Sequence, residues 1–183
     1  MFDCFGVISS LVLPPWFKRN FGEQKGKELE IYYCSRGDMG VMSLKDIAND
    51  VAIKYNKNSE DVFNEWIMST KINEGVVSLI KELKKNNTVV LASNAAEGLV
   101  ESVFTRHHLE DLFDYKFISW KMKKVKPNKG YYEAIINQFP TKFDSIYMID
   151  DRKINLEQLE EIGVKGILFI DAETLRKELG EVL

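Results

Sequence analysis

Several polar side chains stand where short apolar segments of the sequence end. Asp3, Ser93 and the adjacent pair Asp150–Asp151 each follow such a segment, and Lys126 precedes a proline that opens a predicted helix. Carboxylates, a hydroxyl and an ammonium are the groups that hold a phosphoryl group and its metal ion during transfer. Two adjacent carboxylates repel each other unless a cation offsets their charge. The acidic pair is therefore the strongest sign of chemistry in this sequence.

The elements that must position these side chains alternate between strands and helices. Apolar runs of strand length cover 88–92, 115–118, 145–149 and 166–170. Apolar residues recur at helical spacing over 76–83, 99–104, 131–136 and 156–162. This alternation predicts an α/β fold, a Rossmann-like parallel sheet in a three-layer core with helices on both faces. Ligands bind such sheets at the carboxyl ends of the strands, where we expect the polar side chains to converge.

The region from residue 11 to residue 72 differs from the rest, because its apolar residues keep helical spacing and no run reads as a strand. Ser43 with Asp46 is typical of a helix start, and Ser59 precedes a second helical pattern. We therefore predict a small α-helical cap domain at 11–72, inserted in an α/β core made of 1–10 and 73–183. Two residues of the sequence precede Asp3, either because it starts inside a longer strand or because the protein tolerates a short one.

Four segments in this order resemble the motifs of the haloacid dehalogenase-like (HAD) hydrolase superfamily: FDCFGVI (2–8), LASN (91–94), VKP (125–127) and IDDRKIN (149–155). Each motif alone is weak evidence, but their order, spacing and strand context agree over nearly the whole chain. The predicted helical insertion also lies where that superfamily inserts a small cap.

The resemblance implies a catalytic role for each motif. Asp3 would be the nucleophile that forms an aspartyl-phosphate, and Ser93, Asn94 and Lys126 would bind the phosphoryl group, with Lys126 held by Asp151. Mg²⁺ would lie between the Asp3 carboxylate, the backbone carbonyl of Phe5 and Asp150. A lysine ammonium between Asp3 and Asp150 in place of an ion would contradict this arrangement.

Phe5 departs from the superfamily pattern. Many phosphatases that resemble this chain have a second Asp at that position, where it exchanges a proton with the leaving group. A backbone carbonyl still binds a metal ion, but loss of a positioned acid costs about 10²–10⁴-fold in rate. Two alternatives follow: a 2-haloacid dehalogenase, with Arg19 or Arg36 binding the substrate carboxylate, and a binding protein on the same fold with little or no turnover.

Composition limits the other possibilities. The 183 residues carry 25 basic and 28 acidic side chains and a net charge of −3, so charge favours neither nucleic acid nor an anionic membrane as a partner. Two cysteines give no disulfide framework, and we expect a cytoplasmic protein. The sequence thus predicts a Mg²⁺-dependent phosphatase of a small phosphorylated metabolite.

Overall fold

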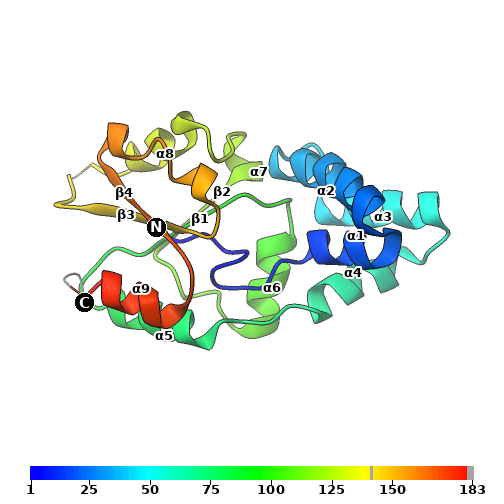
Figure 1. Ribbon diagram of the computed structural model, residues 1–183, viewed down its shortest axis with the longest axis horizontal. Coiled ribbons are helices and arrows are strands. Elements are labelled where there is room, and N and C mark those ends of the chain that lie inside the picture. Colours follow the sequence, from blue (N-terminus) through cyan, green and yellow to red (C-terminus); the bar gives the residue numbers. More distant parts are fainter. Residues whose placement is uncertain (141, 181–183) are drawn as a thin grey trace.

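The computed structural model describes residues 1–140 and 142–180. Its helices, strands and 3₁₀ turns follow one another in this order (Figure 1): α1 (Leu13–Phe21), α2 (Glu23–Asp38), α3 (Leu44–Tyr55), α4 (Ser59–Met68), α5 (Glu74–Leu83), β1 (Val90–Ser93), α6 (Leu99–His107), β2 (Tyr115–Ile118), α7 (Ser119–Met122), α8 (Lys129–Ile136), β3 (Ile146–Asp150), η1 (Lys153–Asn155), η2 (Glu160–Ile162), β4 (Val164–Leu168) and α9 (Ala172–Glu178). The chain is an α/β protein with parallel strands, as predicted.

Two pairs of parallel strands, β1 with β2 and β3 with β4, are joined through the start of the chain. Phe2 forms parallel bridges with Leu91 of β1 and Ile149 of β3. The amide of Ala92 donates to the carbonyl of Phe2 at 2.8 Å, and that of Asp3 donates to the carbonyl of Ile149 at 2.9 Å. The strand order across the sheet is therefore β2–β1–Phe2–β3–β4, with the first two residues of the chain at its centre. Asp3 follows them at the edge of the sheet where the carboxyl ends of the strands lie.

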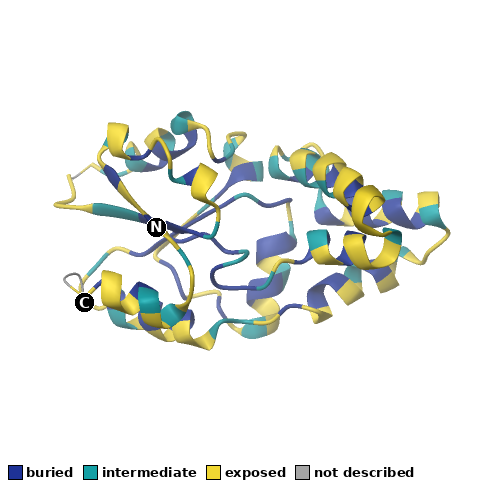
Figure 2. Ribbon diagram, viewed as in Figure 1, coloured by how far each residue is buried: buried dark blue, intermediate teal, exposed yellow. Residues whose placement is uncertain are grey.

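Side chains of the strands alternate between two buried clusters because successive residues of a strand point to opposite faces. Val90, Ala92 and Met148 pack with residues of α8, and Leu91 and Ile149 pack in the larger cluster that includes α5, α6 and α9. Helices thus cover both faces of the sheet (Figure 1), and the strands between them are buried (Figure 2).

The helices α1 to α4 lie together at one end of the molecule, beyond the sheet (Figure 1). Trp16, Phe17, Tyr33 and Trp66 are buried among them, with the Trp16 and Trp66 rings meeting edge to face at 5.4 Å. The predicted capping box of Ser43 and Asp46 begins α3. We call residues 11–72 the helical segment; its boundaries and its separation as a domain stay a prediction.

The two chain crossings between the helical segment and the sheet run side by side. Ser9 and Ile72 form an antiparallel bridge, and the amide of Ser10 donates to the carbonyl of Lys71 at 2.9 Å. No helix among the described residues is both long and apolar enough to cross a membrane.

Two elements differ from the prediction. The expected helix at 156–162 is replaced by η1 and η2. The Asn155 carbonyl accepts from the Tyr132 hydroxyl, so it is not free to continue a helix, and its side chain donates to Asp150. The last strand is β4 at Val164–Leu168, two residues before the predicted 166–170, because Gly163 at φ +73° ends η2 and lets the strand begin at once. The other predicted strands agree with β1, β2 and β3 to within two residues.

Candidate active site

A cleft of about 370 Å³ lies between the carboxyl ends of the strands and the helical segment. From the sheet side it is lined by Asp3, Phe5, Asn94, Ala95, Ala96, Leu99, Lys126, Asp151, Arg152 and Asn155. From the helical segment it is lined by Leu11, Val12, Leu13, Pro14, Lys27, Glu30, Cys34, Asp38 and Ile47. The sequence-predicted side chains therefore do converge at one edge, and apolar residues of the helical segment face them.

Asp3 lies at the floor of this cleft, and both of its carboxylate oxygens are occupied. Oδ1 accepts hydrogen bonds from the Ser93 hydroxyl and the Cys4 amide, each at 2.7 Å. Oδ2 lies 2.9 Å from the Lys126 ammonium. Burial raises the pKa of Asp3, and the charge of Lys126 opposes that rise. These three contacts fix the orientation of the carboxylate toward the cleft.

Lys126 is almost fully buried and bridges two carboxylates. Its Nζ lies 2.9 Å from Asp3 Oδ2 and 2.5 Å from Asp150 Oδ2. We expected a divalent ion to offset the repulsion between Asp3 and Asp150, and the structure has an ammonium in that position. Its partners also differ from the prediction, since Asp150 and Asp3, rather than Asp151, bind its Nζ.

The loop after β3 explains this change of partner. Asp150 Oδ1 accepts from the amide of Arg152 and the side-chain amide of Asn155, each at 2.9 Å, so the carboxylate is turned toward Lys126. The carboxylate of Asp151 instead approaches Gly6 so closely that a Cβ at position 6 would overlap Asp151 Oδ2. Gly6 also has φ +92°, so only glycine suits this position.

Asn94 was expected to bind the phosphoryl group, but both polar atoms of its side chain are hydrogen-bonded to the backbone of Lys126. Its Oδ1 accepts from the amide of Lys126 at 2.9 Å, and its Nδ2 donates to the carbonyl of the same residue at 3.0 Å. The structure thus brings Asp3, Ser93, Lys126 and Asp150 into direct contact and gives Asn94 a positioning contact.

The sequence pattern of one known family, described as haloacid dehalogenase-like hydrolase, matches this chain from residue 15 to residue 169. The match covers well over half of the chain. The chain belongs to the haloacid dehalogenase-like hydrolase family.

Individual relatives of this family are distant. A sesquiterpene phosphatase of Aspergillus oryzae is 26% identical over 109 residues, which cover 59% of this chain and 56% of that protein. A HAD family enzyme of Bacteroides thetaiotaomicron, solved in complex with magnesium and inorganic phosphate, is 17% identical with a TM-score of 0.75, covering 93% of this chain and 92% of the other. L-2-haloacid dehalogenase of Xanthobacter autotrophicus is 13% identical with a TM-score of 0.65, covering 98% and 81%. These structural likenesses establish the fold.

The HAD-family chain has an acidic cluster that could hold a metal ion. One oxygen from each of Asp3, Asp150 and Asp151 lies within 4.8 Å of the others. Among the described residues, Asp151 Oδ1 is buried and has no hydrogen-bond partner. A buried carboxylate oxygen without a partner costs free energy, which a hard cation such as Mg²⁺ would recover. The donor set therefore fits magnesium.

The arginines expected for a dehalogenase lie away from the cleft. Arg19 pairs with Glu65 at 2.5 Å, and Arg36 donates to the carbonyl of Tyr32 and stacks on its ring. Neither is among the residues that line the cleft. Arg152 does line it, but it belongs to the loop after β3.

Sequence reasoning expected the helical segment to cover the site, but it did not identify which residues of α2 line the cleft. Glu30, Cys34 and Asp38 recur along α2 at helical spacing and all line the cleft. Burial, with the nearby Asp3 carboxylate, raises the pKa of Asp38 to about 7. The sequence does contain a signal for this face of α2. Glu30, Cys34 and Asp38 are four residues apart, so they lie on one side of the helix.

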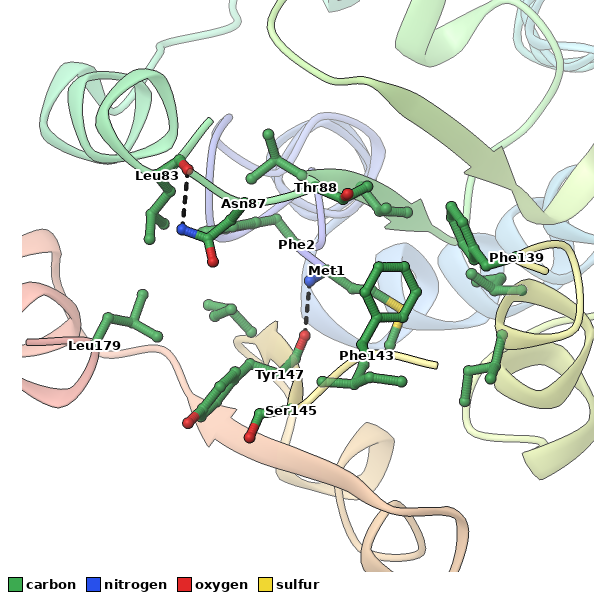
Figure 3. Close-up of a pocket in the computed structure, with 16 residues that line it drawn as sticks. Met1, Phe2, Leu83, Asn87, Thr88, Phe139, Phe143, Ser145, Tyr147 and Leu179 are labelled. Carbon is green, nitrogen blue, oxygen red and sulfur yellow. Dashed lines mark hydrogen bonds between the residues drawn. The ribbon is translucent and has the colours of Figure 1, made fainter. Parts of the chain in front are cut away.

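A second cavity, of about 100 Å³, lies at the other end of the strands (Figure 3). It is lined by residues near the starts of β1 and β3, among them Phe2, Val90 and Tyr147. The described lining residues include no Asp, Glu, Lys, Arg or His side chain. Figure 3 shows the amine of Met1 donating to the carbonyl of Tyr147, at 2.7 Å, beside this cavity. It offers none of the chemistry found at the carboxyl edge.

Proposed function

We propose that this chain is a phosphatase that hydrolyses the phosphate ester of a small metabolite through an aspartyl-phosphate on Asp3. The observation that carries the proposal is the cleft in which a buried hydroxyl and a buried ammonium contact the two oxygens of Asp3. Family membership supports it, as does the sequence likeness to a protein named as a phosphatase.

In the proposed reaction, an oxygen of Asp3 attacks phosphorus in line with the leaving group, and water then hydrolyses the aspartyl-phosphate. Ser93 donates a hydrogen bond to the transferring group, and Lys126 neutralises the charge that develops on it. Because Asp150 is buried and holds Lys126, we assign it a positioning role. Phe5 carries no proton to the leaving group.

Magnesium fits this site as a cofactor. Asp3, the backbone carbonyl of Phe5 and the carboxylate of Asp151 would hold it, and Asp151 Oδ1 is the oxygen of this cluster that has no hydrogen-bond partner among the described residues. A bound Mg²⁺ would supply positive charge to the phosphate oxygens. The motif resemblance implies Asp150 as a ligand instead. Asp150 could take that role only if Lys126 moved away from it when the metal binds.

We also propose that the helical segment acts as the cap that selects the substrate. Its residues form one side of the cleft, and several of them are apolar. They would contact the organic part of the phosphate ester, whose identity the site does not define.

The test is phosphate release from a panel of phosphate esters in the presence of Mg²⁺. We expect turnover by the wild type, none above background by Asp3→Asn, and wild-type activity in Asp111→Asn, an exposed aspartate that does not line the cleft. Full activity of Asp3→Asn would exclude Asp3 as the nucleophile.

The same preparations separate the two alternatives. A dehalogenase would release halide from 2-haloacids, and a chelator would not reduce its rate. A binding protein would show neither reaction in a preparation that is folded by circular dichroism. We place the phosphatase first because Arg19 and Arg36, the candidates for binding a haloacid carboxylate, lie outside the cleft.

A further inference from the structure

Hydrolysis of a phosphate ester with a poor leaving group, such as an alkyl phosphate, needs a proton donor for the leaving oxygen, and Phe5 cannot supply it. The cleft offers four acidic side chains: Asp3, Glu30, Asp38 and Asp151. Asp3 is the proposed nucleophile, Asp151 the proposed metal ligand, and Glu30 pairs with Lys27 at 2.9 Å. Asp38 alone among these four is left for proton transfer.

The backbone of Asp38 is tied to the loop that carries Ser93. Its carbonyl accepts a hydrogen bond from the Ser119 hydroxyl at 2.7 Å, and the oxygen of that hydroxyl accepts from the amide of Ala95 at 3.1 Å. Ala95 comes two residues after Ser93. The end of α2 is therefore connected to the phosphate-binding edge of the sheet through one serine.

Close packing fixes the same helix end. A Cβ at Gly37 would lie 2.7 Å from the Cβ of Ala96, so glycine lets α2 approach the loop after β1 more closely than a residue with a side chain could. The Lys123 ammonium donates to the carbonyl of Gly40 at 3.0 Å, just beyond the helix. The backbone on either side of Asp38 is therefore fixed, at Gly37 by packing against Ala96 and at Gly40 by a hydrogen bond from Lys123.

The side chain of Asp38 has the properties that a general acid requires. It is half-buried in the cleft, and among the described residues no hydrogen bond or ion pair engages its carboxylate. The charged groups that line the same cleft are Asp3, Lys126, Asp151 and Arg152 from the sheet side and Glu30 and Lys27 from its own helix. Its pKa of about 7 leaves a large protonated fraction near neutral pH.

We propose that Asp38 is the general acid and base of the reaction, in place of the carboxylate missing at position 5. This inference rests on the proposed phosphatase function. As Asp3 forms its bond to phosphorus, the ester P–O bond breaks, and the leaving oxygen takes the proton of the Asp38 carboxyl. The resulting Asp38 carboxylate then accepts a proton from the water that attacks phosphorus, and the electron pair of the breaking P–O bond returns to Asp3.

The experiment compares kcat/KM of Asp38→Asn on two esters, butyl phosphate with a poor leaving group and 4-nitrophenyl phosphate with a good one. We expect a loss of about 10²–10⁴-fold on butyl phosphate and less than about tenfold on 4-nitrophenyl phosphate. The matched control is Glu28→Gln, an exposed acid on the same helix, for which we expect no change on either ester.

A pH profile gives a second readout. The wild type should lose kcat/KM on butyl phosphate as the pH rises through about 7, because Asp38 loses its proton, and this limb should be absent from Asp38→Asn.

Equal losses on the two esters, or no loss on either, would overturn the role of Asp38 and leave the phosphatase intact. Absence of turnover in the wild type would overturn the phosphatase and Asp38 with it. Thermal unfolding of Asp38→Asn identifies a folding defect, which would lower both rates together and so count against the proposal.

Discussion

The ammonium of Lys126 allows two buried carboxylates, those of Asp3 and Asp150, to lie close together. Asp3 and Asp150 are both buried, and each has one oxygen on this ammonium. Removing the positive member of a buried ion pair leaves uncompensated charge, which is much more costly than losing an exposed pair. The lysine therefore has a structural effect in addition to its proposed contact with phosphate.

Substituting Lys126 by Met should lower the free energy of unfolding by about 3–5 kcal/mol at neutral pH, measured by urea denaturation. Mg²⁺ should recover part of this loss in Lys126→Met and stabilise the wild type less, because a divalent ion can replace the missing charge at the acidic cluster.

Lys129→Met is the matched control. Lys129 pairs with Glu161 at 3.2 Å on the surface, so its loss should cost at most about 1 kcal/mol. A similar small effect for Lys126→Met would mean that the buried carboxylates are neutral or hydrated and that the bridge is weak.

At the scale of elements, strand ends and loops determine which residues meet. The sequence predicted that Asp3, Ser93 and Asp150 would converge, because each follows an apolar strand and parallel strands share a carboxyl edge. The motif resemblance implied that Asp151 holds Lys126, and this was wrong, since Asp3 and Asp150 bind its Nζ. The choice of carboxylate depends on the loop after β3, where the Arg152 amide and Asn155 orient Asp150.

The predicted helix at 156–162 failed for a related reason. Leu156 and Leu159 do face inward, so the apolar pattern is real. Asn155, however, donates to Asp150 and its carbonyl accepts from Tyr132, and these tertiary contacts override local helix propensity. A pattern of apolar residues carries no information about such contacts.

The loop after Asp3 provides an element-scale prediction. Gly6→Ala combines left-handed strain with a clash against the Asp151 carboxylate, so Asp151 must move. We expect phosphatase kcat/KM to fall by about 10²-fold or more, as misplacement of a site residue by about 1 Å does.

Gly163→Ala separates strain from displacement. Gly163 also has a left-handed backbone, φ +73°, but nothing lies within 4 Å of the position that an alanine methyl would take there. It should cost about 1–2 kcal/mol of stability and leave activity unchanged. If Gly6→Ala behaved in the same way, Asp151 would not need its observed position for activity.

At the scale of the whole molecule, the site combines a sheet edge with a helical segment. Sequence reasoning identified residues 11–72 as helical, and the structure shows four helices beside the sheet. The contribution of Asp38 was not foreseen, because the placement of α2 over the edge depends on tertiary contacts such as that of Gly37 with Ala96.

The central claim is that Asp3 receives the phosphoryl group. It is tested most directly by quenching the enzyme during turnover of a phosphate ester, reducing any acyl phosphate with borohydride, and locating the modified residue by peptide mass spectrometry. We predict substrate-dependent reduction of Asp3 to homoserine in the wild type, and unmodified peptide in Asp3→Asn. Steady turnover with Asp3 unmodified, or with the modification on another residue, would contradict the account.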